Sequence, residues 1–401
     1  MRRMICATAL LIAGAVCFTI KTANHHSGQG LIATANASPK AEPSACKLPM
    51  QMASTPEQTA WQLFVAASCP TNKNQVVWEN WIEQADLYPA NGKVGAAAAH
   101  EAAHRRLHGS PLTRALAKQH GMNAELTPTS VCNEMGGPPP NVIKHATICE
   151  EARLDPTAQG FVTGKGYQIR PGQTKAAQQG TDIQFPDPSV EIKADWIPGT
   201  DFNPPFTCSN PPKGVHVETI DGKCYGLAGM HISSKLLKNW LWATFEPQNL
   251  TTNLNRCVVL GCKDPWGSNP AASSGAFTEQ TPALQTLMKQ ANLASEWFNY
   301  RLDGVQTEFG TAAAPTILGN SVIEGYNVGM DLKQASCITC HSVSSIKNDG
   351  TDGIVTLGGL PGPPVGPEFT PASGWIARDL VWSLGLACPQ LPGKGGLPNC
   401  K

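Results

Sequence analysis

The chain has 401 residues, of which 41% are hydrophobic and 15% are charged, a length that suits one large domain or two ordinary ones. Its 30 Lys and Arg residues balance its 30 Asp and Glu residues, and the formal net charge at pH 7 is zero. This balance argues against a nucleic-acid-binding protein or a polybasic membrane-surface protein.

The N-terminus has the pattern of a secretory signal peptide. Two arginines precede an apolar run over residues 4–20, and small residues at Ala35 and Ala37 suit a cleavage site. We therefore predict a signal peptide over 1–37 and a periplasmic or otherwise exported mature chain. The alternative is an uncleaved anchor, for which the apolar run is short. Beyond it we predict no membrane span in the mature chain.

Next along the chain come segments with helical patterns. The stretch "TPEQTAWQLFVAAS" places Thr55 as N-cap, Pro56 in the first turn and Gln58 at the position of a capping box. A second amphipathic stretch follows at 76–88, and residues 90–125, rich in Ala and His, are predicted as helix.

The middle of the chain changes to the alternation of half-buried strands. We predict strands at 189–197, 224–233 and 240–247, the last two joined by the turn "SKLLKN". Helical patterns return at 280–302 and at 374–387.

These patterns predict an α+β fold: a helical N-terminal part, a small antiparallel sheet in the middle, and a helical C-terminal part that carries a c-type haem loop. We divide the chain into the signal peptide, a mixed α/β body over 38–275, and a helical haem c-binding region over 276–401.

Twelve cysteines follow the predicted signal peptide, and ten of them lie in neighbouring couples outside the motif described next. Because disulfides persist in exported proteins, we predict five bridges: Cys46–Cys69, Cys132–Cys149, Cys208–Cys224, Cys257–Cys262 and Cys388–Cys400.

The stretch "SCITCHS" contains Cys337-Ile-Thr-Cys340-His341, the C-x-x-C-H spacing of a c-type haem attachment site. The two thiols add across the vinyl groups of the porphyrin, and the adjacent histidine supplies the proximal imidazole. We therefore predict one covalent haem c on Cys337 and Cys340, with His341 as iron ligand. A chance motif, or a disulfide beside a stray histidine, is the alternative.

No His or Met follows His341, so a second axial ligand must come from upstream. The candidates are His231, Met230, His216 and Met330, and we select His231 as a second metal-ligating residue. A five-coordinate, open iron is the alternative.

Seven stretches, in chain order, resemble a family of exported bacterial proteins usually called cytochrome c family proteins: "AWQLFVAASCP", "VWENW", "VEIKADWIP", "LAGMHISSKLLKNWLWATFEP", "GNSVIEGY", "SCITCHS" and "RDLVWSL". The likeness runs from about residue 55 to 387, with 90–135 unmatched. Many members have a histidine where this chain has Pro247. The resemblance implies haem binding and electron transfer.

A rival motif is "HEAAH", whose His100 and His104 would share one zinc ion with Glu101 as general base. No clear third ligand follows, since His108 would lie about 12 Å from His100 along a helix.

The sequence therefore favours an exported cytochrome that exchanges electrons with a redox partner protein or a small-molecule donor or acceptor. A haem enzyme of peroxidase or oxidase type, with an open iron, is the alternative, and a zinc hydrolase is the remote one.

Overall fold

The computed structural model describes residues 43–71, 75–89, 133–134, 147–248, 257, 260–273, 278–328, 331–356, 365–366 and 372–389. The predicted signal peptide, the predicted helix at 90–125, the HEAAH motif and Met330 lie outside these residues. Glu42–Lys401 form one unit of the chain.

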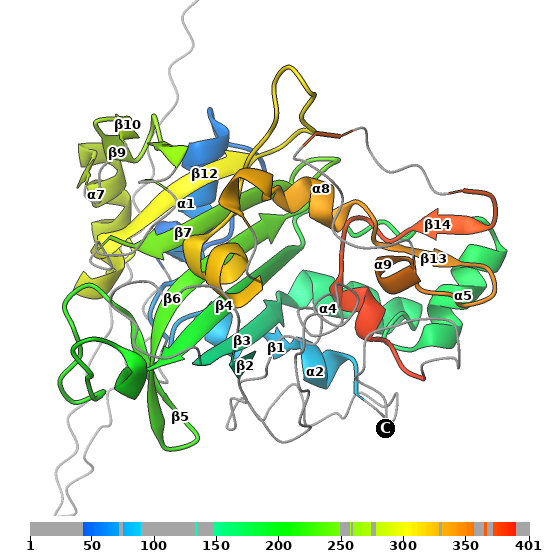
Figure 1. Cartoon of the computed structure of the whole chain (residues 1–401), viewed down its shortest axis with the longest axis horizontal. Helices are drawn as coiled ribbons and strands as arrows, with labels where there is room; N and C mark the ends of the chain where they lie inside the picture. Colours follow the sequence, from blue (N-terminus) through cyan, green and yellow to red (C-terminus); the bar gives the residue numbers. More distant parts are fainter. Residues whose placement is uncertain are drawn as a thin grey trace, which may run out of the picture. The chain divides into compact units, whose positions relative to one another are not determined.

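The main element of the described part is an antiparallel sheet of eight strands (Figure 1). Its central order is β1-β3-β4-β6-β7-β12, with β2 paired to β3 and β5 paired to β6. The strands are β1 (Ile82–Glu83), β2 (Asn133–Glu134), β3 (Thr147–Leu154), β4 (Val190–Pro198), β5 (Val217–Ile220), β6 (Lys223–Ser234), β7 (Leu241–Pro247) and β12 (Tyr300–Gln306).

Three two-stranded antiparallel sheets accompany the large sheet: β8 (Cys262–Lys263) with β10 (Ala272–Ser273), β9 (Ser268–Asn269) with β11 (Glu279–Gln280), and β13 (Ser345–Lys347) with β14 (Trp375–Ala377). The α-helices of the described part are α1 (Pro56–Ala67), α2 (Gln84–Leu87), α4 (Pro156–Lys165), α5 (Arg170–Gln178), α7 (Pro282–Gln290), α8 (Cys337–His341) and α9 (Gly353–Thr356). The 3₁₀ turns are η1 (Ser44–Cys46), η2 (Trp78–Asn80), η4 (Gly199–Asp201), η5 (Ser295–Asn299), η7 (Leu332–Gln334) and η8 (Ser383–Leu386), and η6 (Ser321–Val328) is a π-helix.

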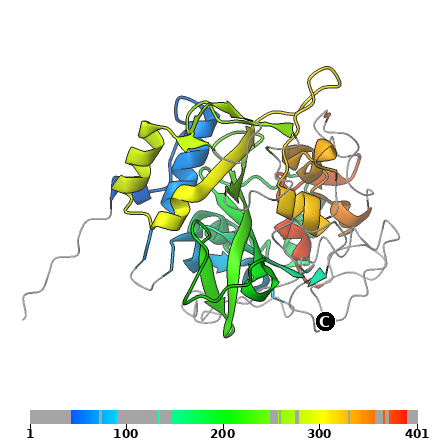
Figure 2. The ribbon, with the colours of Figure 1, turned by 60° about the vertical axis from the view of Figure 1, so that its left-hand side comes forward.

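The two faces of the sheet support different layers. On one face, α1 and α7 enclose an aromatic core in which Phe64 stacks on Phe245 with ring centroids 4.5 Å apart. On the other face, Trp242 packs with Ile338 of α8 and with Leu384 of η8. Figure 2 shows α1 and α7 on one side of the strands and the C-terminal segments on the other. The C-x-x-C-H helix therefore lies on the face opposite α1.

The start of α1 follows the predicted capping pattern. The Thr55 side chain accepts a hydrogen bond from the backbone N–H of Gln58 at 3.1 Å, and Pro56 begins the helix. These features satisfy part of the open end of the helix, and its buried face contributes Trp61, Leu63 and Phe64 to the core.

The predicted strands at 189–197, 224–233 and 240–247 are confirmed as β4, β6 and β7. The predicted fold class is wrong, because the described residues form one large antiparallel sheet with few helices, and not a small sheet between a helical N-terminal part and a helical C-terminal part. Sequence analysis missed β3, which has three charged residues in eight, and β12, whose alternation is broken by a bulge after Leu302. In β3 the charges are buried as pairs, such as Glu151 with Arg153 at 2.6 Å.

The predicted C-terminal helices are also corrected. Residues 280–302 contain α7, but the segment then turns through η5 into strand β12. The predicted helix at 374–387 is a short strand followed by a 3₁₀ turn. Gly374, Asp379 and Leu380 have positive φ angles, and a right-handed helix does not accommodate this conformation.

Three of the predicted disulfides are present: Cys46–Cys69, Cys208–Cys224 and Cys257–Cys262. Cys149 and Cys388 are disulfide-bonded as well, while their predicted partners lie outside the described residues. The division at residue 275 remains a prediction. In the part of the chain that the structure covers, no helix has the length and apolarity needed to cross a bilayer.

Candidate functional site

The C-x-x-C-H motif forms the short helix α8. Cys337 and Cys340 are one helical turn apart, so both sulfurs lie on one side of the helix. Among the described cysteines, these two are thiols and the others are in disulfides. The helix thus presents a pair of reduced sulfurs beside a histidine.

Gln306, the last residue of β12, attaches this helix to the sheet. Its Oε1 accepts a hydrogen bond from the backbone N–H of Ile338 at 3.2 Å, and its Nε2 lies 3.3 Å from the hydroxyl of Ser336. Nε2 also donates to the carbonyl oxygen of Thr316. One buried amide therefore fixes the start of α8 and the segment that leads to it.

His341 is held by contacts from residues far along the chain. Its Nδ1 lies 2.8 Å from the carbonyl oxygen of Leu380, and since a carbonyl only accepts, Nδ1 carries the proton. Trp382 stacks on the imidazole at 4.6 Å between centroids, and Trp242 contacts it at 4.5 Å. Burial lowers the pKa of His341 to about 3, so the ring is neutral at pH 7.

This arrangement is the one that a metal-ligating imidazole needs. Metal-bound histidines generally donate their second ring N–H to a carbonyl or carboxylate, which fixes tautomer and ring orientation. With Nδ1–H bonded to Leu380, the lone pair of His341 is on Nε2. Nε2 has no hydrogen bond to any of the residues that the structure describes, and the motif therefore fits a haem.

The face of the sheet on which the C-x-x-C-H helix lies also carries a polar cluster. His231 lies beside Lys193 on β4 and Thr244 on β7 in the register of the sheet. Its Nε2 is 3.0 Å from one carboxylate oxygen of Glu324 in η6 and 3.2 Å from the other. Its Nδ1 is buried and makes no hydrogen bond within the described residues.

The same cluster acts electrostatically on the motif. Burial and the carboxylate of Glu324 raise the pKa of the Cys340 thiol to about 12. The charges of Lys193, His231 and Glu324 also influence the pKa of His341. The His231 cluster and the C-x-x-C-H helix therefore share one environment, although the sequence separates them by about a hundred residues.

Segment η6 is bound to the sheet through its first residues. The Asn320 amide donates to the Thr244 hydroxyl at 3.0 Å and to the Phe245 carbonyl at 3.1 Å. The Ser321 hydroxyl donates to the Glu246 carboxylate at 2.7 Å. Buried hydrogen bonds of this kind specify one position for the segment, and they place Glu324 against His231.

The structure separates the other candidate ligands from the motif. Met230 points to the opposite face from His231 and lies in the core beneath α1. His216 stacks on Trp297, on the α1 side of the sheet, at 4.3 Å between ring centroids. Met330, His100, Glu101 and His104 are outside the described residues.

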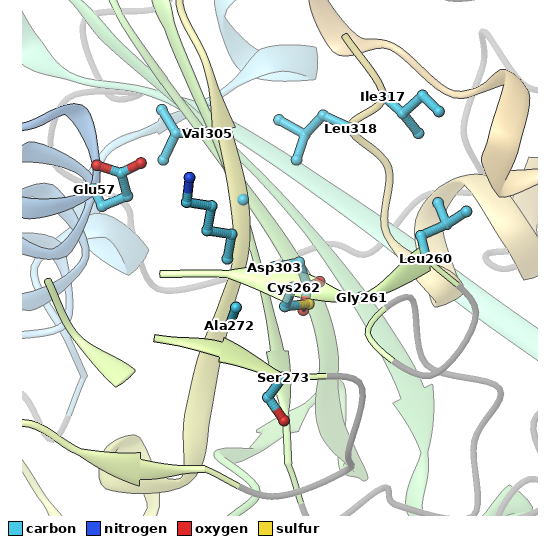
Figure 3. A pocket seen from close by; sticks show the side chains of 12 residues that line it. Glu57, Leu260, Gly261, Cys262, Ala272, Ser273, Asp303, Val305, Ile317 and Leu318 are labelled. Carbon is cyan, nitrogen blue, oxygen red and sulfur yellow. The ribbon is translucent and has the colours of Figure 1, made fainter. Parts of the chain in front are cut away.

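A pocket of about 590 Å³ lies next to the motif, between the start of α1, the paired strands β8 and β10, and β12 (Figure 3). Leu318 lines it, and the carbonyl oxygen of that residue is 3.7 Å from the sulfur of Cys337. Cys337, Cys340 and His341 do not line this pocket. It is therefore a neighbour of the motif and not its cavity.

Sequence reasoning missed the residues that orient the motif: Lys193, Trp242, Gln306, Glu324, Leu380 and Trp382. Five of these six lie in the stretches that carry the family resemblance. The stretches of the family resemblance could therefore have indicated these residues, whereas composition and motif spacing could not.

No protein-family model, curated protein or solved structure matches the chain significantly.

Proposed function

We propose that the chain is an exported c-type cytochrome with one haem bound to Cys337 and Cys340 and with His341 as proximal ligand. The single observation that carries the proposal is the state of His341, a neutral imidazole with Nδ1–H bonded to Leu380 and Nε2 without a hydrogen bond in the described part of the chain. The haem would supply the one-electron chemistry of its iron. The family resemblance supports the same function.

The contribution of the chain itself is to hold and shield this site. Trp242 and Trp382 contact the proximal imidazole, with ring centroids 4.5 and 4.6 Å away. Gln306 fixes the helix that would carry the two thioether bonds. A rigid ligand environment with little rearrangement suits electron transfer, in which no bond to the protein forms or breaks.

Haem staining after denaturing electrophoresis tests this proposal, together with a pyridine haemochrome spectrum of protein made in a host that attaches c-type haem. The wild type should stain, and Cys337→Ala/Cys340→Ala should not. The double variant Cys208→Ala/Cys224→Ala, which removes another neighbouring pair of cysteines, should keep the stain. An unstained wild type, or a stain that survives loss of Cys337 and Cys340, would contradict the proposal.

We propose His231 as the second axial ligand. Its Nε2 is bonded to Glu324 while its buried Nδ1 has no hydrogen bond in the described residues. A ring with one nitrogen on a carboxylate and the other unbonded has the pattern of a metal ligand with its outer-shell partner. Ferric absorption and EPR spectra should show a low-spin wild type that becomes high-spin in His231→Ala. His216→Ala removes a histidine from the other face and should remain low-spin.

The second candidate function is a haem enzyme with an open iron, and the pairing of His231 with Glu324 favours it. An imidazole hydrogen-bonded to a carboxylate beside the haem motif is a possible general acid and base. A high-spin wild-type spectrum, with peroxide turnover that falls in both His231→Ala and Glu324→Gln, would establish this function in place of electron transfer. A low-spin spectrum without turnover would exclude it.

A further inference from the structure

A second group of metal-binding side chains lies on the α1 side of the sheet, away from the C-x-x-C-H helix. It consists of Glu79 in η2, Glu218 in β5, and His216 immediately before β5. Glu79 and His216 are buried, with 0% and 6% of their surface exposed. Two members of this group are buried and Glu218 is half-buried, and acidic side chains are rarely buried unless they are paired or bind a cation.

The distances within this group match the edges of a metal coordination shell. The Nε2 atom of His216 is 3.1 Å from an oxygen of Glu79 and 3.6 Å from an oxygen of Glu218. Ligand atoms bound at about 2.0–2.2 Å around one ion, in tetrahedral or octahedral geometry, are themselves about 3.0–3.6 Å apart. The three potential ligand atoms all lie within 4.8 Å of one another.

Other groups orient the ligands from outside. The Nδ1 atom of His216 faces an oxygen of Glu296 at 3.9 Å, the side on which metal-bound histidines commonly have a carboxylate. The second carboxylate oxygen of Glu79 accepts a hydrogen bond from the backbone N–H of Val76 at 3.0 Å. Trp297 stacks on the imidazole at 4.3 Å. The backbone and the aromatic ring thus fix the geometry of the ligands.

We propose that Glu79, His216 and Glu218 form a mononuclear site for a divalent transition-metal ion, with one nitrogen and two oxygen ligands. This ligand set suits Zn²⁺. The ion would connect η2 to the edge hairpin β5–β6 and would lie on the opposite face from the proposed haem. The proposal does not depend on haem attachment.

The test is zinc titration of the purified full-length chain after dialysis against a chelator, followed by calorimetry and by elemental analysis for bound metal. The wild type should bind one zinc ion through this site. His216→Gln and Glu79→Gln should each weaken binding at least tenfold. Glu279→Gln, a matched substitution of an exposed glutamate, should bind zinc as the wild type does.

Thermal unfolding of the metal-free proteins, followed by circular dichroism, separates loss of the site from loss of the fold. Only variants that unfold cooperatively, as the wild type does, are compared for zinc binding. Failure of the wild type to bind zinc would overturn the proposal and leave His216 as a hydrogen-bond partner of Glu79. Zinc that remains bound at full stoichiometry in His216→Gln would also overturn the proposal. The ion would then bind at another site, such as His100 and His104. Haem staining, measured on the same samples, reports separately on the proposed function.

Discussion

His341 donates its Nδ1 proton to the carbonyl oxygen of Leu380 at 2.8 Å, across 39 residues of sequence. Leu380 and the preceding Asp379 both have positive φ angles, at 66° and 52°, and non-glycine residues adopt this conformation at an energetic cost. Contacts in the surrounding structure offset that cost, and the resulting backbone conformation directs the carbonyl oxygen of Leu380 toward the imidazole of His341. The orientation of His341 is therefore a property of the C-terminal segment as much as of the motif itself.

The stacked ring of Trp382 gives a first prediction, which rests on the proposed haem. Trp382→Ala should keep the covalent haem, because Cys337 and Cys340 are unchanged, but it should free the His341 ring to adopt several orientations. The ferric EPR signal should broaden or divide into more than one species. Trp375→Ala, a partly buried tryptophan of β14 without a contact to His341, serves as control and should give the wild-type signal.

The buried amide of Gln306 gives a second prediction. Gln306→Leu removes the hydrogen bonds to Ile338 and Ser336 and should lower the free energy of unfolding by about 1–3 kcal/mol, measured by chemical denaturation. It should also lower the haem content. Gln248→Leu removes comparable buried bonds to Thr278, far along the chain from the motif, and should destabilise the protein without changing the haem content. Equal haem loss in both variants would show that general destabilisation is responsible.

The third prediction concerns Asp352, which accepts hydrogen bonds at 2.6 Å from both Arg170 and Arg378. All three side chains are buried, and the two arginines lower the pKa of Asp352 against the effect of burial. Asp352→Asn removes the carboxylate charge that two buried arginines share and should cost about 3–5 kcal/mol of unfolding free energy. Asp182→Asn changes an exposed aspartate bonded to the backbone of Ala377, and should cost less than about 0.5 kcal/mol.

A loss of stability at Asp352→Asn no greater than that of the Asp182 control would mean that the arginine pair is not held by this carboxylate. The result bears on the site, because Arg378 lies two residues before Leu380.

The fourth prediction is a pH dependence. Burial raises the pKa of Glu191 on β4 from 4.5 to about 7, against the opposing effects of Ser383 and Lys193. Because the folded state holds this proton more tightly than the unfolded chain, the associated stability is present in full below about pH 4.5. It is lost as the pH rises to about 7, and it changes little above that.

Glu191→Gln should therefore be more stable than the wild type near pH 8, by at most about 3 kcal/mol, and the difference should vanish near pH 4. The partial exposure of this side chain brings the effect below that limit. Denaturant unfolding at both pH values provides the measurement, with the exposed Glu279→Gln as control. A gain in stability that is the same at both pH values would assign it to packing and not to the titration of Glu191.

Local sequence determined the features that depend on short spacing. These features are the turn between Cys337 and Cys340, the cap at Thr55, the strand patterns of β4, β6 and β7, and the cysteine couples close in sequence. Such features can be predicted from sequence, because the short backbone segment between neighbouring residues has few allowed conformations. The identity of the proposed haem ligands on the motif was accessible for the same reason.

Tertiary structure decided what depends on residues far apart. The charged strand β3 is stable in the sheet because its charges find partners when buried, and β12 is a strand despite a bulge because β7 offers its hydrogen bonds. Helical periodicity at 374–387 yielded to a strand and a tight turn, in which long-range bonds to Ser344 and His341 outweigh a short helix of marginal stability. The contacts of Gln306 with α8 and of His231 with Glu324 likewise form only when the sheet brings these segments together. No local sequence pattern therefore predicts them.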